Sequence, residues 1–466
     1  MDTLLKIVSL INEYLSDYVL IILLAGTGLY FSIRTRFVQV RSFAEGWKNT
    51  FGKFSLHKKG EGSFSSFQAL TAAVAAQVGT GNIVGASGAI LVGGPGAIFW
   101  MWIVAFLGMS TIYAEAVLAQ KTRITDEEGT PHGGPVYYIK YAFPNLFGRI
   151  LAWMFGIACI VALGFMGTMV QANSIGETCS KAFGIPTYLI GIILAVLSGA
   201  VFLGGVTRLA RVTEKLVPFM ACLYLLGGFV ILLLRIEFLP ETFLLIFKYA
   251  FSPEALIGGG FGQALKTAIS QGVKRGLFSN EAGMGSTPHA HAIAQVSSPH
   301  IQGTVAMIGV FIDTAIVLTA TALIIISTVY TGNGPLAHAT GATYKELLRN
   351  SGLTQTNLVQ YAVSTVSSAS FGNIFVAVCL LFFAFSTIIS WNYFGRINFH
   401  YLFGKKCIFI YSILAILFIF MGTLVKSDLV WALQDMFNQL MVLPNVVALL
   451  ALSGLVAASA KKKNEL

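Results

Sequence analysis

Two glycine-rich stretches place polar side chains inside otherwise apolar sequence. The first, residues 75–85, reads A-A-Q-V-G-T-G-N-I-V-G and contains Gln77, Thr80 and Asn82 among three glycines. Glycine is a poor helix former, and an unpaired backbone group in hydrocarbon costs several kcal/mol. We therefore expect a membrane helix that unwinds here, which is tolerated only where the backbone is buried in protein or lines a cavity. Close helix packing through the G-x-x-x-G motif in the same stretch is the alternative, although packing alone does not require the polar side chains.

The second stretch lies about 200 residues later and shows the same anomalies. Residues 272–286 read G-V-K-R-G-L-F-S-N-E-A-G-M-G-S. Glycine-interrupted apolar segments in matching positions of two halves indicate a transporter's binding site. The N–H groups of an unwound helix suit a carboxylate, and its C=O groups suit Na⁺. The pair thus predicts a site for a small zwitterion and its coupling ion, unless Lys274–Glu281 is a loop after a shorter helix.

Asp313 lies among apolar residues of another predicted span. A carboxylate at mid-membrane costs about 3 kcal/mol on insertion scales, so it is by default a functional hypothesis. We expect Asp313 to ligate or support a cation, and the alternative is a structural ion pair with Lys274 or Arg275.

Other polar residues in or beside predicted spans are ambiguous. Glu115 is expected to be solvated or paired, with Lys121 near the same interface. Gln171 and Asn173 either face a substrate or cap their helix. Three hydroxyl side chains come just before Trp391: Ser386, Thr387 and Ser390. Such hydroxyls more often bond to the backbone of their own helix, although three of them beside an indole can also form the wall of a site. Three histidines lack metal-ligand partners and are expected to be solvated: His289, His291 and His300.

The composition is that of a polytopic helical membrane protein. Of 466 residues, 56% are hydrophobic and 11% are charged, with a mean hydropathy of +0.76. Soluble domains carry about 25% charged residues. Eleven spans of near the ~20 residues that a bilayer requires can be drawn, at 18–33, 65–92, 96–120, 149–173, 184–204, 214–234, 256–285, 303–330, 371–395, 406–425 and 429–456.

Lysine and arginine predict the orientation. With the N-terminus outside, the cytoplasmic loops and the C-terminus hold 20 of the 30 basic residues, and the outer segments hold seven. This bias is the positive-inside pattern, so the net charge of +10 does not indicate nucleic-acid binding. We predict a multi-pass protein of the plasma membrane with its N-terminus outside and its C-terminus cytoplasmic.

The spans divide into two halves of opposite orientation, each opening with one glycine-rich stretch. The predicted division is an N-terminal helix and basic loop (1–64), a first five-helix repeat (65–234), an external connection (235–255), a second five-helix repeat (256–456) and a cytoplasmic tail (457–466). None of the loops is long enough to be a separate enzyme domain.

Longer motifs around these stretches resemble the alanine/glycine:cation symporter family. They are G-T-G-N-I at 79–83, G-G-P-G-A-I-F-W-M-W at 93–102, Y-A-E-A at 113–116, V-Q-A-N at 170–173, G-L-F-S-N-E-A-G-M-G-S at 276–286 and S-T-I-I-S-W at 386–391. The resemblance covers nearly the whole chain. It implies the inverted five-plus-five fold of the leucine transporter with one extra N-terminal helix, and sodium-coupled uptake of alanine or glycine across a prokaryotic plasma membrane.

The resemblance also implies site residues. The expected substrate-binding set is Gln77, Gly79, Thr80, Gly81, Asn82, Gln171, Phe278 and Trp391. The expected Na⁺ ligands are Ala75, Gln77, Val78, Asn82, Ser386 and Thr387. We add Asp313 to this set because a carboxylate at mid-membrane is costly unless it has a functional role. Gln77 would contribute its carbonyl and Asn82 its side chain, while Ala75 and Val78 carbonyls with Ser386 and Thr387 would form a second sodium site.

Other function classes fit less well. The chain has no G-x-x-x-x-G-K-[ST] loop for an ATP-driven pump and no H-E-x-x-H motif for a metalloprotease. A channel usually shows pore-lining rings across identical subunits rather than two internal breaks. We expect a symporter and not an enzyme, with Na⁺ as coupling ion, no cofactor and a small neutral amino acid as substrate. Proton coupling is the alternative. The sequence leaves the oligomeric state, and alanine against glycine, open.

Overall fold

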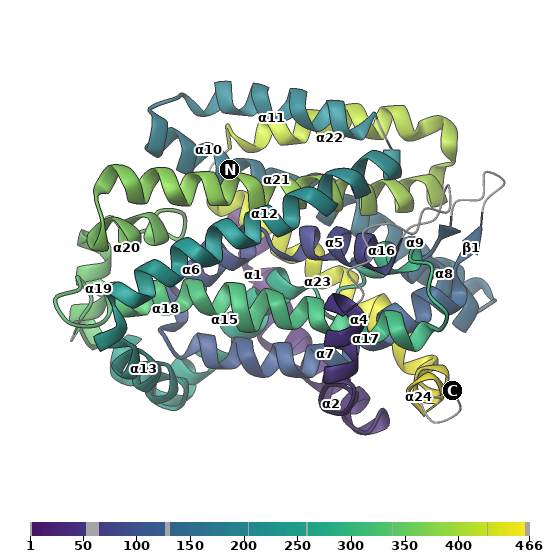
Figure 1. The fold of residues 1–466 in the computed structure, drawn as a ribbon, viewed down its shortest axis with the longest axis horizontal. Coiled ribbons are helices and arrows are strands. Elements are labelled where there is room, and N and C mark those ends of the chain that lie inside the picture. The colour runs from purple at the N-terminus through teal and green to yellow at the C-terminus, as the bar shows by residue number, and fades with distance from the viewer. Residues whose placement is uncertain are drawn as a thin grey trace.

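The computed structural model describes residues 2–52, 65–125, 131–203, 205–257, 260–337, 339–425 and 427–461. These residues form a bundle of long helices that run mainly along one direction (Figure 1). The sole sheet in the described ranges is a small antiparallel pair, β1 (Ile124–Thr125) and β2 (Pro131–His132), with Ile124 opposite His132. The all-helical class predicted from composition is confirmed.

The first half of the chain holds the helices up to Leu234. They are α1 (Asp2–Tyr14), α2 (Ile21–Arg34), α3 (Val38–Arg41), α4 (Phe43–Phe51), α5 (Ser66–Gln77), α6 (Ala86–Gly93), α7 (Ala97–Thr122), α8 (Pro135–Ala142), α9 (Leu146–Cys159), α10 (Thr168–Phe183), α11 (Thr187–Phe202) and α12 (Gly205–Leu234). Wider π-helical turns join or continue some of them: η1 (Leu15–Leu20), η2 (Gly81–Gly85) and η3 (Ile160–Gly167).

The second half begins with η4 (Ile236–Phe238), a short 3₁₀ turn. Its helices are α13 (Leu239–Phe251), α14 (Glu254–Ile257), α15 (Phe261–Asn280), α16 (Pro288–Ala292), α17 (Pro299–Val310), α18 (Thr319–Val329), α19 (Gly341–Asn350), α20 (Leu358–Val366), α21 (Ala369–Phe403), α22 (Ile408–Gly422), α23 (Ser427–Ala451) and α24 (Ser453–Lys461). The π-helical η5 (Phe311–Leu318) links α17 to α18, and the 3₁₀ turn η6 (Lys405–Cys407) precedes α22.

Seven described helices are long and apolar enough to cross a membrane, and two bent pairs raise that number to nine. The bent pairs are Ser66–Gln77 with Gly81–Gly93, at 45°, and Asp428–Ala451 with Ser453–Lys461, at 60°. Two of the eleven predicted spans do not meet this criterion. The span at 184–204 corresponds to Thr187–Phe202, a shorter apolar helix, and the span at 256–285 corresponds to α15, which is rich in polar residues.

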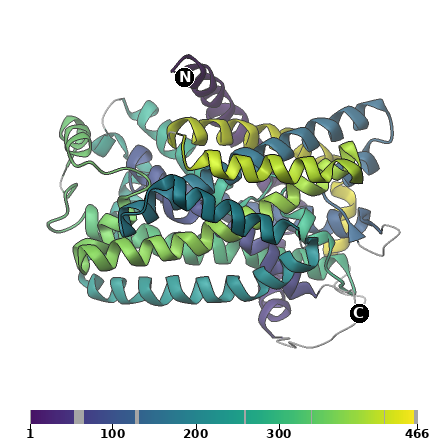
Figure 2. The ribbon, with the colours of Figure 1, turned by 90° about the horizontal axis from the view of Figure 1, so that it is seen from above.

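The two broken helices lie together in the centre of the bundle. Helix α15 packs against η2 and α6, and α7 packs against both α15 and α17. Helix α21 covers α5 and α10 (Figure 1). Helices α11 and α22 pack together as an outer layer at the top of Figure 1 and lie nearest the viewer in Figure 2, where the bundle is seen from above. The polar segments are therefore enclosed by apolar helices on several sides.

Candidate functional site

The first break begins where α5 ends. Val78 has an extended backbone, with φ −78° and ψ 91°, and the helix resumes at Gly81 as η2. Two N–H groups that the break frees are bound by side-chain amides: Gly79 donates to Asn82 Oδ1 at 2.9 Å, and Thr80 donates to Gln171 Oε1 at 3.1 Å. The predicted break is confirmed, and Gln171 faces it rather than capping its own helix.

The second break is shorter than predicted. Helix α15 continues through Asn280, so the segment from Lys274 to Asn280 is helical and the loop alternative is wrong. The chain turns at Glu281, which has a left-handed φ of 59°, and at Gly283 and Gly285, which have φ of +90° and +81°. The first glycine of the stretch, Gly272, serves a different purpose. A Cβ at Gly272 would lie 2.8 Å from the Ala97 carbonyl oxygen, so glycine permits the close approach of α7.

Asp313, in η5, joins the two breaks. Its Oδ1 accepts from Asn82 Nδ2 at 2.6 Å, and both carboxylate oxygens lie 3.0 Å from Ser279 Oγ. Thr314 Oγ1 donates to Oδ2 at 2.8 Å. Its side chain is fully buried, and among the described residues it has no ion pair with a basic side chain.

The predicted alternative partners of Asp313 lie elsewhere. Lys274 Nζ and Arg275 Nη1 contact Asp435 at 2.7 and 3.1 Å. Asp435, on α23, is a second aspartate inside a predicted span and is only 4% exposed. The predicted alternative, a structural ion pair of Asp313 with Lys274 or Arg275, is therefore wrong, because both basic side chains pair with Asp435.

Two glutamines contribute amide atoms with no hydrogen-bond partner among the described residues. Gln77 Nε2 donates to the Asn280 carbonyl at 2.8 Å, while its Oε1 is buried and unbonded. Gln171 Oε1 accepts from Thr80, while its Nε2 is buried and unbonded. An unsatisfied buried polar group costs about 1–3 kcal/mol. Both glutamine side chains adjoin the first break.

A second group of oxygens lies beside the end of α5, close to the first break. Thr387 Oγ1 contacts the Ala75 carbonyl oxygen at 2.9 Å, and Ser386 Oγ contacts the same oxygen at 3.3 Å. The Thr387 hydroxyl also adjoins Gly79, where a Cβ would lie 2.3 Å from it. Of the four residues predicted for a second sodium site, hydrogen-bond contacts join Ala75, Ser386 and Thr387. Val78 forms the extended turn that follows.

Aromatic rings close one side of the cluster. Phe278 and Trp391 meet edge-on, with centroids 5.6 Å apart, and Phe278 also contacts Trp431 at 4.8 Å. Trp391 Nε1 donates to the Glu281 carboxylate. The structure thus adds residues that were not predicted as site residues: Ser279, Asn280, Glu281, Thr314 and Trp431. The first four adjoin predicted features in sequence, whereas nothing in the sequence around Trp431 indicated its position.

The turn after α15 is held by Glu115 of α7. Its carboxylate accepts from the N–H groups of Gly283 and Gly285 at 3.2 and 2.9 Å, and from Asn445 Nδ2 at 2.7 Å. The side chain is fully buried, so the expectation that Glu115 is solvated or paired with Lys121 is wrong. Asn173, the other ambiguous residue, donates to the Gly422 carbonyl at 3.0 Å and joins α10 to the end of α22.

The three histidines after this turn are buried rather than solvated, with exposed fractions of 0%, 0% and 7% for His289, His291 and His300. His289 Nδ1 donates to the Ser286 carbonyl at 2.6 Å, and its Nε2 accepts from Asn398 Nδ2 at 2.9 Å. His291 Nδ1 accepts from Gln302 Nε2 at 2.8 Å. The expectation failed because the segment folds back into the bundle, with His289 and His291 on α16 and His300 at the start of α17, instead of forming a loop in water.

Burial lowers the pKa of His289 to about 4 and that of His291 to about 3, since desolvation disfavours the charged ring. Below the unfolded value of about 6.5, the unfolded chain binds protons that the folded protein does not. Stability is therefore complete above pH 6.5 and falls toward pH 4. We expect a lower thermal midpoint at pH 5 than at pH 7.5 in detergent, with a smaller difference in His289→Gln. An equal difference in both proteins would contradict this explanation.

These features define a multi-pass membrane transporter, in which two interrupted helices present polar groups to one buried cluster. The sodium:alanine symporter family matches residues 1–465, and the chain belongs to this family. The chain is 40% identical over 462 residues to the sodium/alanine symporter AgcS of Methanococcus maripaludis, covering 99% of this chain and 97% of that protein. It is 37% identical over 457 residues to the probable sodium/glutamine symporter GlnT of Bacillus subtilis, covering 98% and 90%.

Solved structures show the same fold at much lower sequence identity. A crystal structure of a manganese transporter from Eremococcus coleocola matches with a TM-score of 0.56 at 12% identity, covering 87% of this chain and 90% of that chain. A mutant of the same protein matches with a TM-score of 0.52 at 16% identity, covering 86% and 81%. This similarity supports a transporter fold for the chain.

Proposed function

We propose that this protein couples the inward movement of Na⁺ to the uptake of a small neutral amino acid, alanine in the first place and glycine in addition. The observation that carries the proposal is the cluster of Asn82, Ser279 and Asp313, which joins both helix breaks at one buried carboxylate. A buried carboxylate without a basic partner favours a cation beside it. The membership of the chain in a sodium:alanine symporter family agrees with this chemistry.

The first break suits the carboxylate of an amino acid. The N–H groups of Gly79 and Thr80 now bind the Oδ1 of Asn82 and the Oε1 of Gln171. A substrate carboxylate that takes the place of Gln171 Oε1 accepts the same hydrogen bond from the Thr80 N–H. It also gains the Gln171 Nε2 donor, which has no hydrogen-bond partner among the described residues. Phe278 and Trp391 then limit the size of the substrate side chain.

Na⁺ favours hard oxygen ligands, as the C=O groups at the end of an unwound helix provide. One proposed site uses Asp313 with the Gln77 and Asn82 oxygens. The other uses the Ala75 and Val78 carbonyls with the hydroxyls of Ser386 and Thr387. The contacts of Ala75 with the two hydroxyls, at 2.9 and 3.3 Å, support the second site.

We further propose eleven spans arranged as two inverted five-helix repeats after one N-terminal helix. Segments that the basic residues assign to opposite sides of the membrane lie at opposite ends of the bundle. Helices α19 and α20 lie at one end, whereas α8, β1 and α24 lie at the other (Figure 1). This separation supports a membrane plane perpendicular to the long axis. The bias of the basic residues supports the orientation with the N-terminus outside and the C-terminus cytoplasmic.

Proteoliposomes test the proposed function. An inward Na⁺ gradient at equal pH should drive accumulation of labelled alanine, and collapse of the gradient should release it. A proton gradient in Na⁺-free buffer should drive none. Accumulation with the proton gradient alone would support the proton-coupled alternative, and fast equilibration without accumulation under either gradient would indicate a channel.

The wall formed by Phe278 predicts substrate size. Phe278 contacts both Trp391 and Trp431, and its removal leaves a large gap beside the cluster. We expect Phe278→Ala to weaken alanine uptake and to raise glutamine uptake relative to alanine. The ratio of the two initial uptake rates checks this expectation, and an unchanged ratio in a well-folded variant would show that the ring does not border the substrate.

A further inference from the structure

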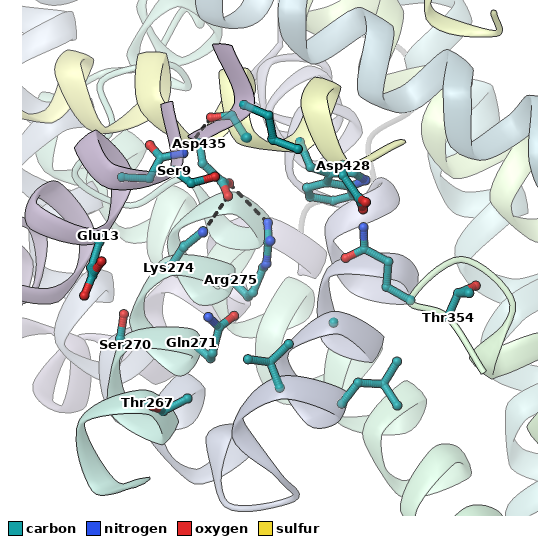
Figure 3. A pocket seen from close by; sticks show the side chains of 18 residues that line it. Ser9, Glu13, Thr267, Ser270, Gln271, Lys274, Arg275, Thr354, Asp428 and Asp435 are labelled. Atoms are coloured by element: carbon teal, nitrogen blue, oxygen red, sulfur yellow. Dashed lines mark hydrogen bonds and ion pairs between the residues drawn. The ribbon is translucent and has the colours of Figure 1, made fainter. Parts of the chain in front are cut away.

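A second polar cavity lies outside the buried cluster. It has a volume of about 770 Å³ and is lined by α1, α6, α15, α23 and the segment before α20 (Figure 3). The lining residues belong to chain segments that the basic residues place toward the outside. The proposed orientation therefore opens this cavity to the medium from which substrate is taken up.

The cavity contains a surplus of positive charge at its inner part. Lys274 and Arg275 both point toward Asp435, so two cations share one carboxylate (Figure 3). The Arg275 guanidinium also lies over the Trp431 ring at 4.6 Å, which fixes its orientation. The side chain of Arg275 is 9% exposed, and its buried Nε has no hydrogen-bond partner among the described residues. A fixed guanidinium with an unused donor is suited to a carboxylate.

Acidic groups occupy the flanks of the same cavity. Glu13 and Asp428 lie on either side of the basic pair (Figure 3). Positive charge in the middle and negative charge at the edges complements an amino acid, whose carboxylate and ammonium are separated by one carbon. The arrangement is less suited to an inorganic cation, which the two basic side chains would repel.

We propose that this cavity is an outer capture site for the zwitterionic amino acid, with its carboxylate at Lys274 and Arg275 and its ammonium toward Asp428 or Glu13. The proposal rests on the amino-acid symport proposed above. The substrate carboxylate competes with Asp435 for the basic pair, and this competition loosens the contact between α15 and α23. Trp431 links this contact to the central cluster, because its ring also touches Phe278.

The Lys274→Gln variant tests the proposal, because it removes one positive charge and leaves the ion pair between Arg275 and Asp435 in place. The measurement is the association rate of labelled alanine with purified protein at fixed Na⁺, in low and high choline chloride. Alanine has no net charge, so the effect comes from the short-range contact of its carboxylate with the basic pair, a charge-assisted interaction that added salt screens. We expect an association rate about tenfold lower in Lys274→Gln, with little salt dependence and an unchanged equilibrium affinity. Lys266→Gln is the matched control on the same helix and should behave as the wild type.

Two probes identify the recognised group. Propionate, which retains the carboxylate of alanine, should slow alanine association in the wild type and not in Lys274→Gln. Alaninamide, which lacks the carboxylate, should slow neither. Equal association rates and salt dependence in wild type and Lys274→Gln, or equal inhibition by both probes, would overturn the capture site. Loss of the proposed function itself is distinguishable, because wild-type protein would then show no Na⁺-dependent alanine binding.

Discussion

The Gly81→Ala variant is expected to lose about 100-fold or more in alanine affinity, the equivalent of about 3 kcal/mol. An added Cβ would lie 2.9 Å from the Ser279 Cα and 3.1 Å from a Phe278 ring carbon. The backbone contact cannot yield by a side-chain rotation, so η2 and α15 must separate. Binding is lost because the proposed site requires both breaks at once. Equilibrium binding of labelled alanine in saturating Na⁺ measures this loss.

Gly85→Ala is the matched control, one turn along the same segment. Its Cβ would meet Phe278 at 3.9 Å, which is an ordinary contact. We expect this variant to bind alanine nearly as the wild type does. Wild-type affinity in Gly81→Ala, with both variants monodisperse in detergent, would exclude a site built from the two breaks. Unfolding of Gly81→Ala alone would instead be detected by gel filtration before any binding is measured.

The Asp313→Asn variant is expected to lower Na⁺ affinity by about 10- to 100-fold, since it removes the negative charge that is proposed to face the cation. Asparagine retains an oxygen for Asn82 and offers an N–H to the hydroxyls of Ser279 and Thr314. By linkage, the apparent alanine affinity at low Na⁺ should fall as well. It should largely recover at saturating Na⁺, because the amino-acid contacts are intact. Alanine binding as a function of Na⁺ concentration gives both quantities.

Ser279→Ala separates charge from hydrogen bonding. It removes a donor 3.0 Å from both Asp313 oxygens and leaves the carboxylate in place. We expect its Na⁺ affinity to fall by less than that of Asp313→Asn. An unchanged Na⁺ dependence in folded Asp313→Asn would rule out the coupling role of the carboxylate.

The sequence predicted the fold class and the first break well. Apolar spans follow from the cost of exposed polar groups in lipid, and the glycines with Gln77, Thr80 and Asn82 identified the place where a helix is interrupted. The second break was predicted to begin too early in the chain, because helix α15 continues through Asn280. Gly272 of α15 allows close packing with α7 instead, and glycine composition alone does not distinguish packing from unwinding.

The partners of buried charges could not be predicted. Asp313 was singled out by its insertion cost, and it is fully buried, but its neighbours come from the two broken helices and depend on how these cross. The same limit explains the errors for Glu115 and the histidines. Glu115 binds the N–H of Gly283, 168 residues later in the chain. Asp435 forms the ion pair with Lys274 that was one predicted alternative for Asp313. Such pairings are set by tertiary contacts rather than by local pattern.

The central claim is that Na⁺ and the amino acid bind interdependently at the joined breaks. Its most direct test is the equilibrium dissociation constant of labelled alanine for purified wild-type protein, as Na⁺ replaces choline at constant ionic strength. We predict that alanine affinity rises steadily with Na⁺ and is nearly absent in choline alone. An alanine affinity that is the same in choline and in Na⁺ would contradict the account.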